Sequence, residues 1–185
     1  MSEHQDVIAE IERMFIEEGA QEYLGEEVSM ATHMLQTAAF AEADGAEAEL
    51  VVAALLHDVG HFTGTISGRE LMAGTDNEHS DQGAAWLSTA FPPEVTEPIR
   101  LHVPAKRYLC TVDPAYFSRL SPASVHTLEL QGGRMSDAEV EAYEAEPFAQ
   151  AGVQVRRYDD AGKDPDMVTP PLEHYRPVME RCVRR

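Results

Sequence analysis

Apolar side chains recur at intervals of three and four residues through the first quarter of the chain. One such segment runs from Val7 to Gly19, and a second runs from Met30 to Gly45. This spacing places the apolar residues on one face of a helix, and a glycine at the end is a common helix stop. The pattern therefore predicts two amphipathic helices that pack on a shared core.

The next segment, from Glu49 to Val59, is apolar on almost every face, and Gly60 is placed to end it. A helix that is hydrophobic all round belongs in the middle of a protein. The sequence therefore predicts a central helix from Glu49 to Val59, with its far end inside the molecule.

Caps and prolines mark further helices in the rest of the chain. A segment from Ser80 to Phe91 ends before two prolines, and a segment from Glu94 to His102 ends just before Pro104. The spacing predicts two more helices, one from Pro122 after a Ser121 cap and one after the Ser136 capping box. The irregular segments are expected at 62–78, 131–135 and 162–171.

Strand signals are almost absent. Only the segment from Val153 to Arg156 alternates between apolar and polar residues, and it is too short to form a sheet. With 185 residues and 43% hydrophobic residues, the chain is long enough for one ordinary core. We therefore expect an all-α helical bundle, a single domain over residues 1–185.

The charge balance excludes several kinds of partner. Fourteen basic residues stand against 33 acidic ones, which gives a net charge of −19. Such a surface repels nucleic-acid backbones and anionic lipid. No apolar stretch approaches the roughly 18 residues that a membrane span needs. We expect no nucleic-acid partner and no membrane insertion, and nothing in the sequence indicates a protein partner.

The two cysteines, Cys110 and Cys182, lie far apart in the sequence and form no CxxC pair. They therefore indicate neither a disulfide framework nor a zinc knuckle. The first residues carry acids, whereas a signal peptide begins with basic residues and an apolar run. Both observations favour a cytoplasmic protein.

The central helix ends in the sequence His57-Asp58-Val59-Gly60-His61. On a helix, these two imidazoles share one face with a carboxylate between them. A carboxylate at the buried end of an apolar helix costs several kcal/mol unless it is paired or binds a metal. A His–Asp hydrogen bond and a metal site both satisfy that requirement, and the dipeptide alone does not separate them.

Further candidate ligands lie along the chain at His33, His79, His102 and Asp159. Taken singly, each histidine is more often an ordinary core or surface residue than a ligand. Together with His57 and Asp58 they form a nitrogen and oxygen set without thiols, which suits iron, manganese or zinc. The set is large enough for two metals if Asp58 bridges them. His4, His126 and His174 have no comparable setting.

The order of these residues resembles the HD-domain superfamily in its bimetallic form. Most members of that superfamily are phosphohydrolases, and a minority are mixed-valence di-iron oxygenases. Seven ordered motifs bring the chain close to the oxygenases that cleave carbon–phosphorus bonds: Tyr23-Leu-Gly-Glu26, Ala53 to His61, His102-Val-x-Ala-Lys-Arg-Tyr108, Ser121-x-Ala-Ser124, Gln131-Gly-Gly133, Tyr158-Asp-x-x-Gly-Lys163 and Glu173-His-Tyr-Arg176. The resemblance spans about residues 21–180, and so many spaced motifs are highly specific.

The resemblance implies an HD-domain fold and a pair of irons, Fe2+ and Fe3+, with O2 as co-substrate. It makes His33, His57, Asp58 and Asp159 ligands of one iron, while Asp58 bridges to a second iron held by His79 and His102. That second iron keeps open positions.

The same resemblance places His61, Lys106, Ser124 and Gln131 against the phosphonate. It places Tyr23 and Glu26 near the amine and the oxygen-binding position. On a chain with net charge −19, a phosphonate dianion needs local positive charge. We expect the irons, Lys106 and His61 to supply it.

The reaction implied is the oxidative cleavage of a 1-hydroxy-2-aminoethylphosphonate, a small organophosphonate. The free amine gives glycine and phosphate, and the trimethylated amine gives glycine betaine and phosphate. Two alternatives remain: a bimetallic phosphohydrolase acting on a phosphomonoester or nucleotide, and a non-catalytic metabolite sensor. Metal content separates the three, because two irons indicate the oxygenase, manganese or zinc the hydrolase, and no metal the sensor.

The loop from Phe62 to Glu78 departs most from the branch of the family that acts on the free amine. It carries Asp76 and Glu78 in place of an aromatic-rich stretch. Acidic residues at a distance suit a trimethylammonium group, which donates no strong hydrogen bond. The sequence therefore slightly favours the trimethylated substrate, and a solvated acidic loop is the alternative.

Overall fold

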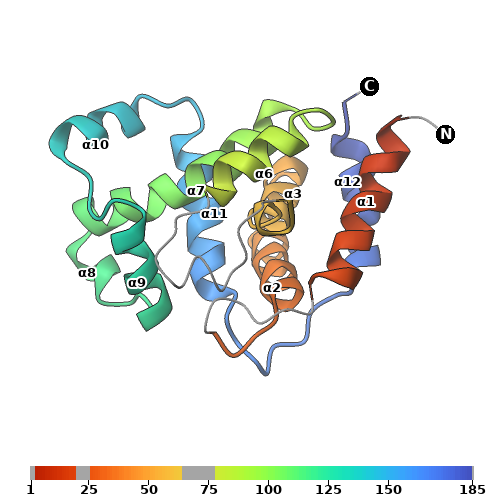
Figure 1. Ribbon diagram of the computed structural model, residues 1–185, viewed down its shortest axis with the longest axis horizontal. Helices are drawn as coiled ribbons and strands as arrows, with labels where there is room; N and C mark the ends of the chain where they lie inside the picture. The colour runs from red at the N-terminus through yellow and green to blue at the C-terminus, as the bar shows by residue number, and fades with distance from the viewer. Residues whose placement is uncertain (1–2, 20–25, 64–77, 185) are drawn as a thin grey trace.

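The computed structural model describes residues 3–19, 26–63 and 78–184, and within them the chain forms helices and no β-strand (Figure 1). The helices are α1 Glu3–Glu17, α2 Met30–Ala43, α3 Ala48–Leu56, α4 Gly60–Thr63, α6 His79–Leu87, α7 Pro93–Val112, α8 Pro114–Phe117, α9 Pro122–Leu130, α10 Asp137–Glu144, α11 Ala149–Ala161 and α12 Leu172–Cys182. The all-α prediction is confirmed.

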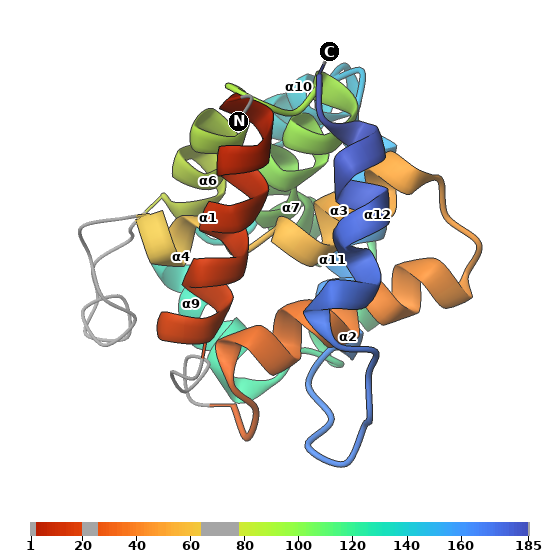
Figure 2. The same ribbon diagram turned by 90° about the vertical axis from the view of Figure 1, so that its right-hand side faces the viewer.

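The larger of two hydrophobic clusters is centred on α3, in which every side chain from Val51 to Leu56 is buried. Apolar faces of α1, α2, α6 and α12 cover it, and the helices at the two ends of the chain, α1 and α12, pack against each other (Figure 2). The prediction of a fully buried central helix is confirmed. Its burial puts the residues that follow Leu56 inside the molecule.

A smaller hydrophobic cluster lies at the other end of the molecule, among α8, α9, α10 and parts of α7 and α11. Helix α7 contributes Ile99 to the larger cluster and Leu101 to the smaller one, and α11 likewise contributes to both. These two helices also pack extensively on each other. His102 on α7 and Asp159 on α11 therefore lie where the two clusters meet.

Helix α7 is twice as long as the sequence predicted. We expected an end at His102 before Pro104, but the helix continues through Pro98 and Pro104 to Val112. Each proline removes one backbone donor, which usually ends a helix. Packing of α7 against α3, α6 and α11 outweighs that loss. As a result, His102 and Lys106 lie one turn apart on the same helix face.

The boundary after α3 also differs from the prediction. The helix ends at Leu56, residues 57–59 form a turn, and Gly60 begins the short helix α4 instead of ending α3. A Cβ on Gly60 would lie 1.9 Å from the backbone oxygen of His79, so only glycine allows this approach of α4 to α6. His57 and His61 consequently do not share a single helix face.

The alternating segment from Val153 to Arg156 lies inside helix α11, so its pattern reflects packing on two sides and not a strand. The Ser121 cap and the Ser136–Glu139 capping box are both present, as predicted. Helix α6 begins one residue before the predicted start and ends at Leu87, four residues before the predicted end.

The irregular segments at 131–135 and 162–171 are confirmed, whereas Phe62 lies within α4 and residues 64–77 fall outside the described ranges. Cys110 and Cys182 are buried free thiols. Among the helices that are described, none combines the length and apolar character needed to cross a bilayer.

Candidate active site

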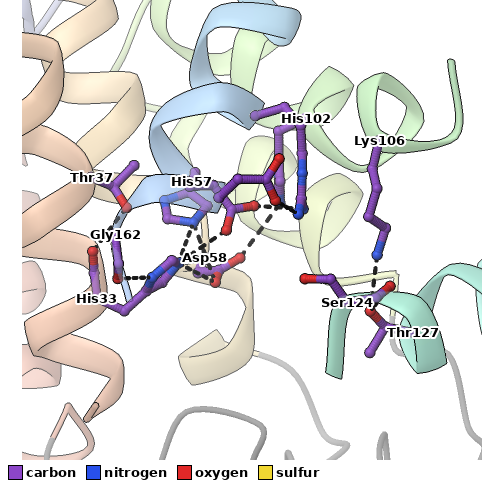
Figure 3. A network of polar contacts seen from close by, with 12 residues as sticks. His33, Thr37, His57, Asp58, His102, Lys106, Ser124, Thr127 and Gly162 are labelled. Carbon is purple, nitrogen blue, oxygen red and sulfur yellow. Dashed lines mark hydrogen bonds and ion pairs between the residues drawn. The ribbon is translucent and has the colours of Figure 1, made fainter. Parts of the chain in front are cut away.

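The Asp58 carboxylate lies at the centre of a cluster of buried imidazoles (Figure 3). The turn after α3 carries it, and its side chain is only 2% exposed. Its two oxygens face different partners: Oδ2 faces His33 and His57, and Oδ1 faces His79 and His102. The cluster is thereby divided into two halves that share one carboxylate.

The first half, which we call the enclosed half, consists of His33, His57, Asp159 and the Oδ2 atom of Asp58. The Nε2 atoms of His33 and His57 lie 3.0 Å apart. His33 Nε2 lies 3.4 Å from Asp159 Oδ1, and His57 Nε2 lies 3.3 Å from Asp58 Oδ2. Four side-chain atoms from α2, α11 and the turn after α3 therefore converge on one point.

The second half, which we call the open half, consists of His79, His102 and the Oδ1 atom of Asp58. The two Nε2 atoms lie 3.3 Å apart, and they lie 3.3 and 3.5 Å from Asp58 Oδ1. His79 is the first residue of α6 and His102 lies in the middle of α7. The predicted ligands of the second metal are thus brought together across two helices.

Backbone carbonyls orient three of these imidazoles. The Nδ1–H groups of His33, His57 and His102 donate to the carbonyl oxygens of Gly162 (2.7 Å), Ala54 (2.9 Å) and Ile99 (2.7 Å), respectively. A histidine that donates through Nδ1 presents a bare Nε2 lone pair. All three Nε2 atoms therefore point into the cluster, and each can bind a metal when its imidazole is neutral.

The approach of Gly162 to α2 allows the contact with His33. A Cβ at Gly162 would lie 2.6 Å from the Thr37 hydroxyl, so a side chain has no room there. The Gln36 side chain fixes the same segment, because its amide donates to the carbonyl of Asp164 and accepts from the amide of that residue. The segment after α11 is therefore attached to α2 directly behind His33.

Both carboxylates of the cluster are ionised. Burial alone would raise the pKa of Asp58, but the surrounding imidazoles of His57, His102 and His79 hold it well below its usual range. Burial opposes ionisation of Asp159 as well, yet the adjacent Arg156 guanidinium holds its pKa well below its usual range. Burial also lowers the pKa of His102 to about 4, so this imidazole is neutral near pH 7.

These atoms fit a bound metal better than a hydrogen-bond network. In the enclosed half the Nε2 atoms of His33 and His57 lie 3.0 Å apart beside a carboxylate oxygen. Burial lowers the pKa of His57, but the charge of Asp58 outweighs it and raises that pKa. This point therefore attracts a cation, and a bound metal can take the place of the proton. Asp58 Oδ2 and Asp159 Oδ1 are buried without a hydrogen-bond partner. A metal about 2.1 Å from each of two nitrogens at a right angle separates them by about 3.0 Å.

A small pocket opens beside the open half. Its lining includes Asp58, His61, His79, His102, Val103, Lys106, Ser124, Thr127, Gln131, Arg156 and Asp159, but not His33 or His57. The residues predicted to bind the phosphonate, namely His61, Lys106, Ser124 and Gln131, are thus brought together with the open half. The Oε1 atom of Gln131 is buried without a hydrogen-bond partner, which suits a donor from a bound molecule.

Lys106 is the buried cation of this pocket. It lies one turn after His102 on α7, and its ammonium donates to Thr127 Oγ1 at 2.9 Å (Figure 3). Burial, assisted by the charge of Arg156, lowers the pKa of Lys106 to about 7. Thr127 belongs to α9, one turn after Ser124, so a single face of α9 forms the wall opposite the imidazoles.

His61 does not carry the positive charge that we expected. Its side chain is 4% exposed, stacks on His79 and lies 4.0 Å from Asp58 Oδ1. Burial, together with the neighbouring His79, lowers the pKa of His61 to about 3. The imidazole is therefore neutral at pH 7, and it can offer a hydrogen bond but not a charge.

Arg156, which the sequence did not single out, holds Asp159 in place. Its guanidinium donates to Asp159 Oδ2 at 2.6 Å, to Asp160 and to the Tyr116 hydroxyl. The hydrogen bond to Asp159 Oδ2 occupies that oxygen and leaves Oδ1 for the enclosed half. An arginine one helical turn before a buried aspartate was the available signal in the sequence.

Glu26 lies at the edge of this region, where it accepts a hydrogen bond from Ser121 and pairs with Lys163. It does not belong to the pocket lining described above. Tyr23 and Asp76 lie outside the described residues. Glu78 is described: it precedes His79 in a left-handed conformation and is exposed.

Comparisons with known proteins place this geometry in context. A family model described as HD domain matches residues 30–120. The chain is 45% identical over 178 residues to 1-hydroxy-2-(trimethylamino)ethylphosphonate dioxygenase (glycine-betaine-forming) of Leisingera caerulea, covering 96% of this chain and 91% of that protein. It is 41% identical over 169 residues to hydroxymethylphosphonate dioxygenase of Gimesia maris, covering 91% of this chain and 84% of the relative.

Proposed function

The chain belongs to the HD-domain phosphonate dioxygenases, and from this membership we propose that it cleaves the carbon–phosphorus bond of 1-hydroxy-2-(trimethylamino)ethylphosphonate. The hydroxyl-bearing carbon becomes the carboxylate of glycine betaine, and phosphorus leaves as phosphate. One O2 supplies both added oxygen atoms, so the reaction balances without a further reductant.

Membership in this family decides between the three functional classes left open by the sequence. The relatives named above are dioxygenases, so the chain is an oxygenase and not a phosphohydrolase or a sensor. The HD domain and its His and Asp clusters fit the use of a metal and O2. The identity of the metal as a mixed-valence pair of irons is part of the proposal.

The observation that carries the proposal is the position of Asp58 between two pairs of imidazoles, with the open pair facing a pocket that holds a buried lysine. His33, His57, Asp159 and Asp58 Oδ2 would hold one iron, and His79, His102 and Asp58 Oδ1 the other. When bound there, two irons supply the one-electron chemistry by which O2 oxidises the hydroxyl-bearing carbon.

The pocket residues bind and orient the phosphonate. Lys106 offers its ammonium and Ser124 and Thr127 offer hydroxyls to the phosphonate, while the buried Gln131 carbonyl accepts a hydrogen bond from the substrate hydroxyl. A charge-assisted hydrogen bond from Lys106 is the strongest of these contacts. Since Lys106 and His102 share one face of α7, a phosphonate held by Lys106 presents its carbon toward the open half.

We place the amine near Glu26, at the edge of this region, and the family resemblance implies that Tyr23 acts with it. The trimethylated substrate is preferred for two reasons. The relative that is 45% identical is named for that compound, and the Asp76 to Glu78 segment offers diffuse negative charge before α6. The free amine, which gives glycine, is the less favoured substrate.

Oxygen uptake by the purified enzyme tests this function. We expect O2 consumption with the trimethylated hydroxyphosphonate, release of phosphate and glycine betaine in equal amounts, and about two irons per chain. Neither product should form without O2. Phosphate release that continues anaerobically, or from a phosphomonoester, would instead identify a hydrolase.

A further inference from the structure

The chain contains only two lysines, Lys106 and Lys163, and both reach the same face of helix α9. Lys106 donates to Thr127 Oγ1 at 2.9 Å, and Lys163 donates to Ser124 Oγ at 3.0 Å. They come from different parts of the chain, since Lys106 lies in α7 and Lys163 follows α11. Two ammonium groups therefore flank a pocket wall on a molecule whose net charge is −19.

Lys163 has a second partner, the Glu26 carboxylate. Its Nζ lies 3.4 Å from Glu26 Oε1, and that oxygen also accepts a hydrogen bond from Ser121 at 2.6 Å. The side chains of Lys163 and Glu26 are only 13% and 15% exposed. Neither charge is well hydrated, so each is stabilised by the other.

The substrate of the proposed function carries the same two charges as this ion pair, an anionic phosphonate and a cationic amine. We infer that substrate binding exchanges the partners of Lys163 and Glu26. Lys163 moves from the carboxylate to a phosphonate oxygen beside Ser124, and Glu26 turns to the substrate ammonium. Lys163 is then a second phosphonate-binding lysine, and each poorly hydrated charge keeps an opposite charge throughout.

This exchange discriminates against phosphonates that lack a cation. When such a molecule draws Lys163 away, the Glu26 carboxylate loses its counter-charge and gains none in return. Leaving a poorly hydrated charge unpaired is costly, and this cost acts as selection against the wrong ligand. The pair therefore favours amine-bearing hydroxyphosphonates over hydroxymethylphosphonate.

The inference rests on the proposed function for its ligand class, but its first test requires no turnover. Inorganic phosphate serves as a probe of the anion site in the iron-loaded enzyme, with binding measured by calorimetry. Lys163→Met should weaken phosphate binding by about tenfold or more. The control is Arg157→Met, which removes one positive charge from an exposed residue of α11 and should leave binding within about twofold.

A second variant separates an exchange from a merely structural ion pair. Glu26→Gln frees Lys163 from the carboxylate, so phosphate binding should tighten, while the preference for the trimethylated substrate over hydroxymethylphosphonate, expressed as kcat/KM, should shrink. Lys163→Met should raise KM for both compounds and change kcat less.

Unchanged phosphate affinity in Lys163→Met or in Glu26→Gln would overturn the exchange. If phosphate binding responds as expected but no hydroxyphosphonate is turned over, the proposed function fails and the anion-binding role of Lys163 stands.

Discussion

The enclosed and open halves of the Asp58 centre use similar side chains but are supported differently. In the enclosed half, both imidazoles donate to backbone carbonyls, Arg156 holds Asp159, and neither His33 nor His57 lines the pocket. In the open half, only two imidazoles accompany the shared carboxylate, and both form part of the pocket wall. From this difference we propose a division of labour in which one half anchors and the other half meets the substrate.

Removing the carboxylate that joins the halves should have the largest effect. We expect Asp58→Ala to reduce iron from about two ions per chain to nearly none and to abolish activity, because one side chain serves both halves. Metal analysis of the purified variant checks this, with Asp137→Ala in the first turn of α10 as the control. Parent-like iron content would show that Asp58 does not bridge.

Chelation should distinguish the two halves. The open half offers three ligand atoms from the protein and the enclosed half offers four, so a chelator should remove one iron first and stop turnover at that stage. His102→Ala should resemble this half-depleted enzyme, with about one iron retained and no activity. The control is His126→Ala, an exposed histidine of α9. Loss of both irons in a single phase would contradict the proposed difference between the enclosed and open halves.

A substitution of Lys106 tests whether the substrate binds beside the open half. We expect Lys106→Ala to raise KM by about tenfold or more, since a charge-assisted hydrogen bond contributes roughly 1.5 to 3 kcal/mol. Iron content should not change. Arg107→Ala removes the same charge from the next residue, whose guanidinium contacts the carbonyl of Gly133. Equal effects of the two variants would argue against a specific contact.

The pH dependence of anion binding should follow from the same lysine. The ammonium form binds anions, and the pKa of Lys106 is lowered to about 7 by burial and by Arg156 and Lys163, against the opposing charges of Asp159 and Asp160. Lys106 therefore loses its proton as pH rises through about 7, and competitive inhibition by sulfate should weaken several-fold between about pH 6 and 8. Lys106→Arg should remove this dependence; a persistent slope would assign it to another group.

The choice of amine should give the smallest effect, because diffuse charge discriminates weakly. We expect a few-fold higher kcat/KM for the trimethylated hydroxyphosphonate than for the free amine. Neutralising Asp76 and Glu78 together, as Asp76→Asn and Glu78→Gln, should shrink this ratio. If the double variant keeps the parent ratio, the acidic segment is a solvated surface and Glu26 makes the choice with Tyr23.

The part of the fold that depends on hydrophobic spacing was predictable, and the part that depends on competition between packing and proline was not. The apolar faces of α1, α2 and α3 define the larger cluster in the sequence itself. In α7, however, Pro104 predicts an end, and only packing by α3, α6 and α11 carries the helix past it. The sequence therefore did not predict that His102 and Lys106 lie on the same face of one helix.

The candidate site shows the same contrast. The six clustered His and Asp residues could be chosen because buried ionisable groups need partners, and the family resemblance assigned them in order. The roles of Lys163 and Arg156 were not predicted, because they depend on which loop ends beside which helix in the folded protein. Yet Lys163 is one of only two lysines in a chain with 33 acidic residues, which was a compositional signal available from the start.

The hydrogen bond from His33 to the carbonyl of Gly162 spans 129 positions of the chain. During synthesis, α2 and α3 leave the ribosome long before α11, so His33 and His57 wait without the carbonyl and carboxylate that complete their half. The enclosed half therefore cannot be complete, or offer a metal all four of its side-chain atoms, until almost the whole chain has been made.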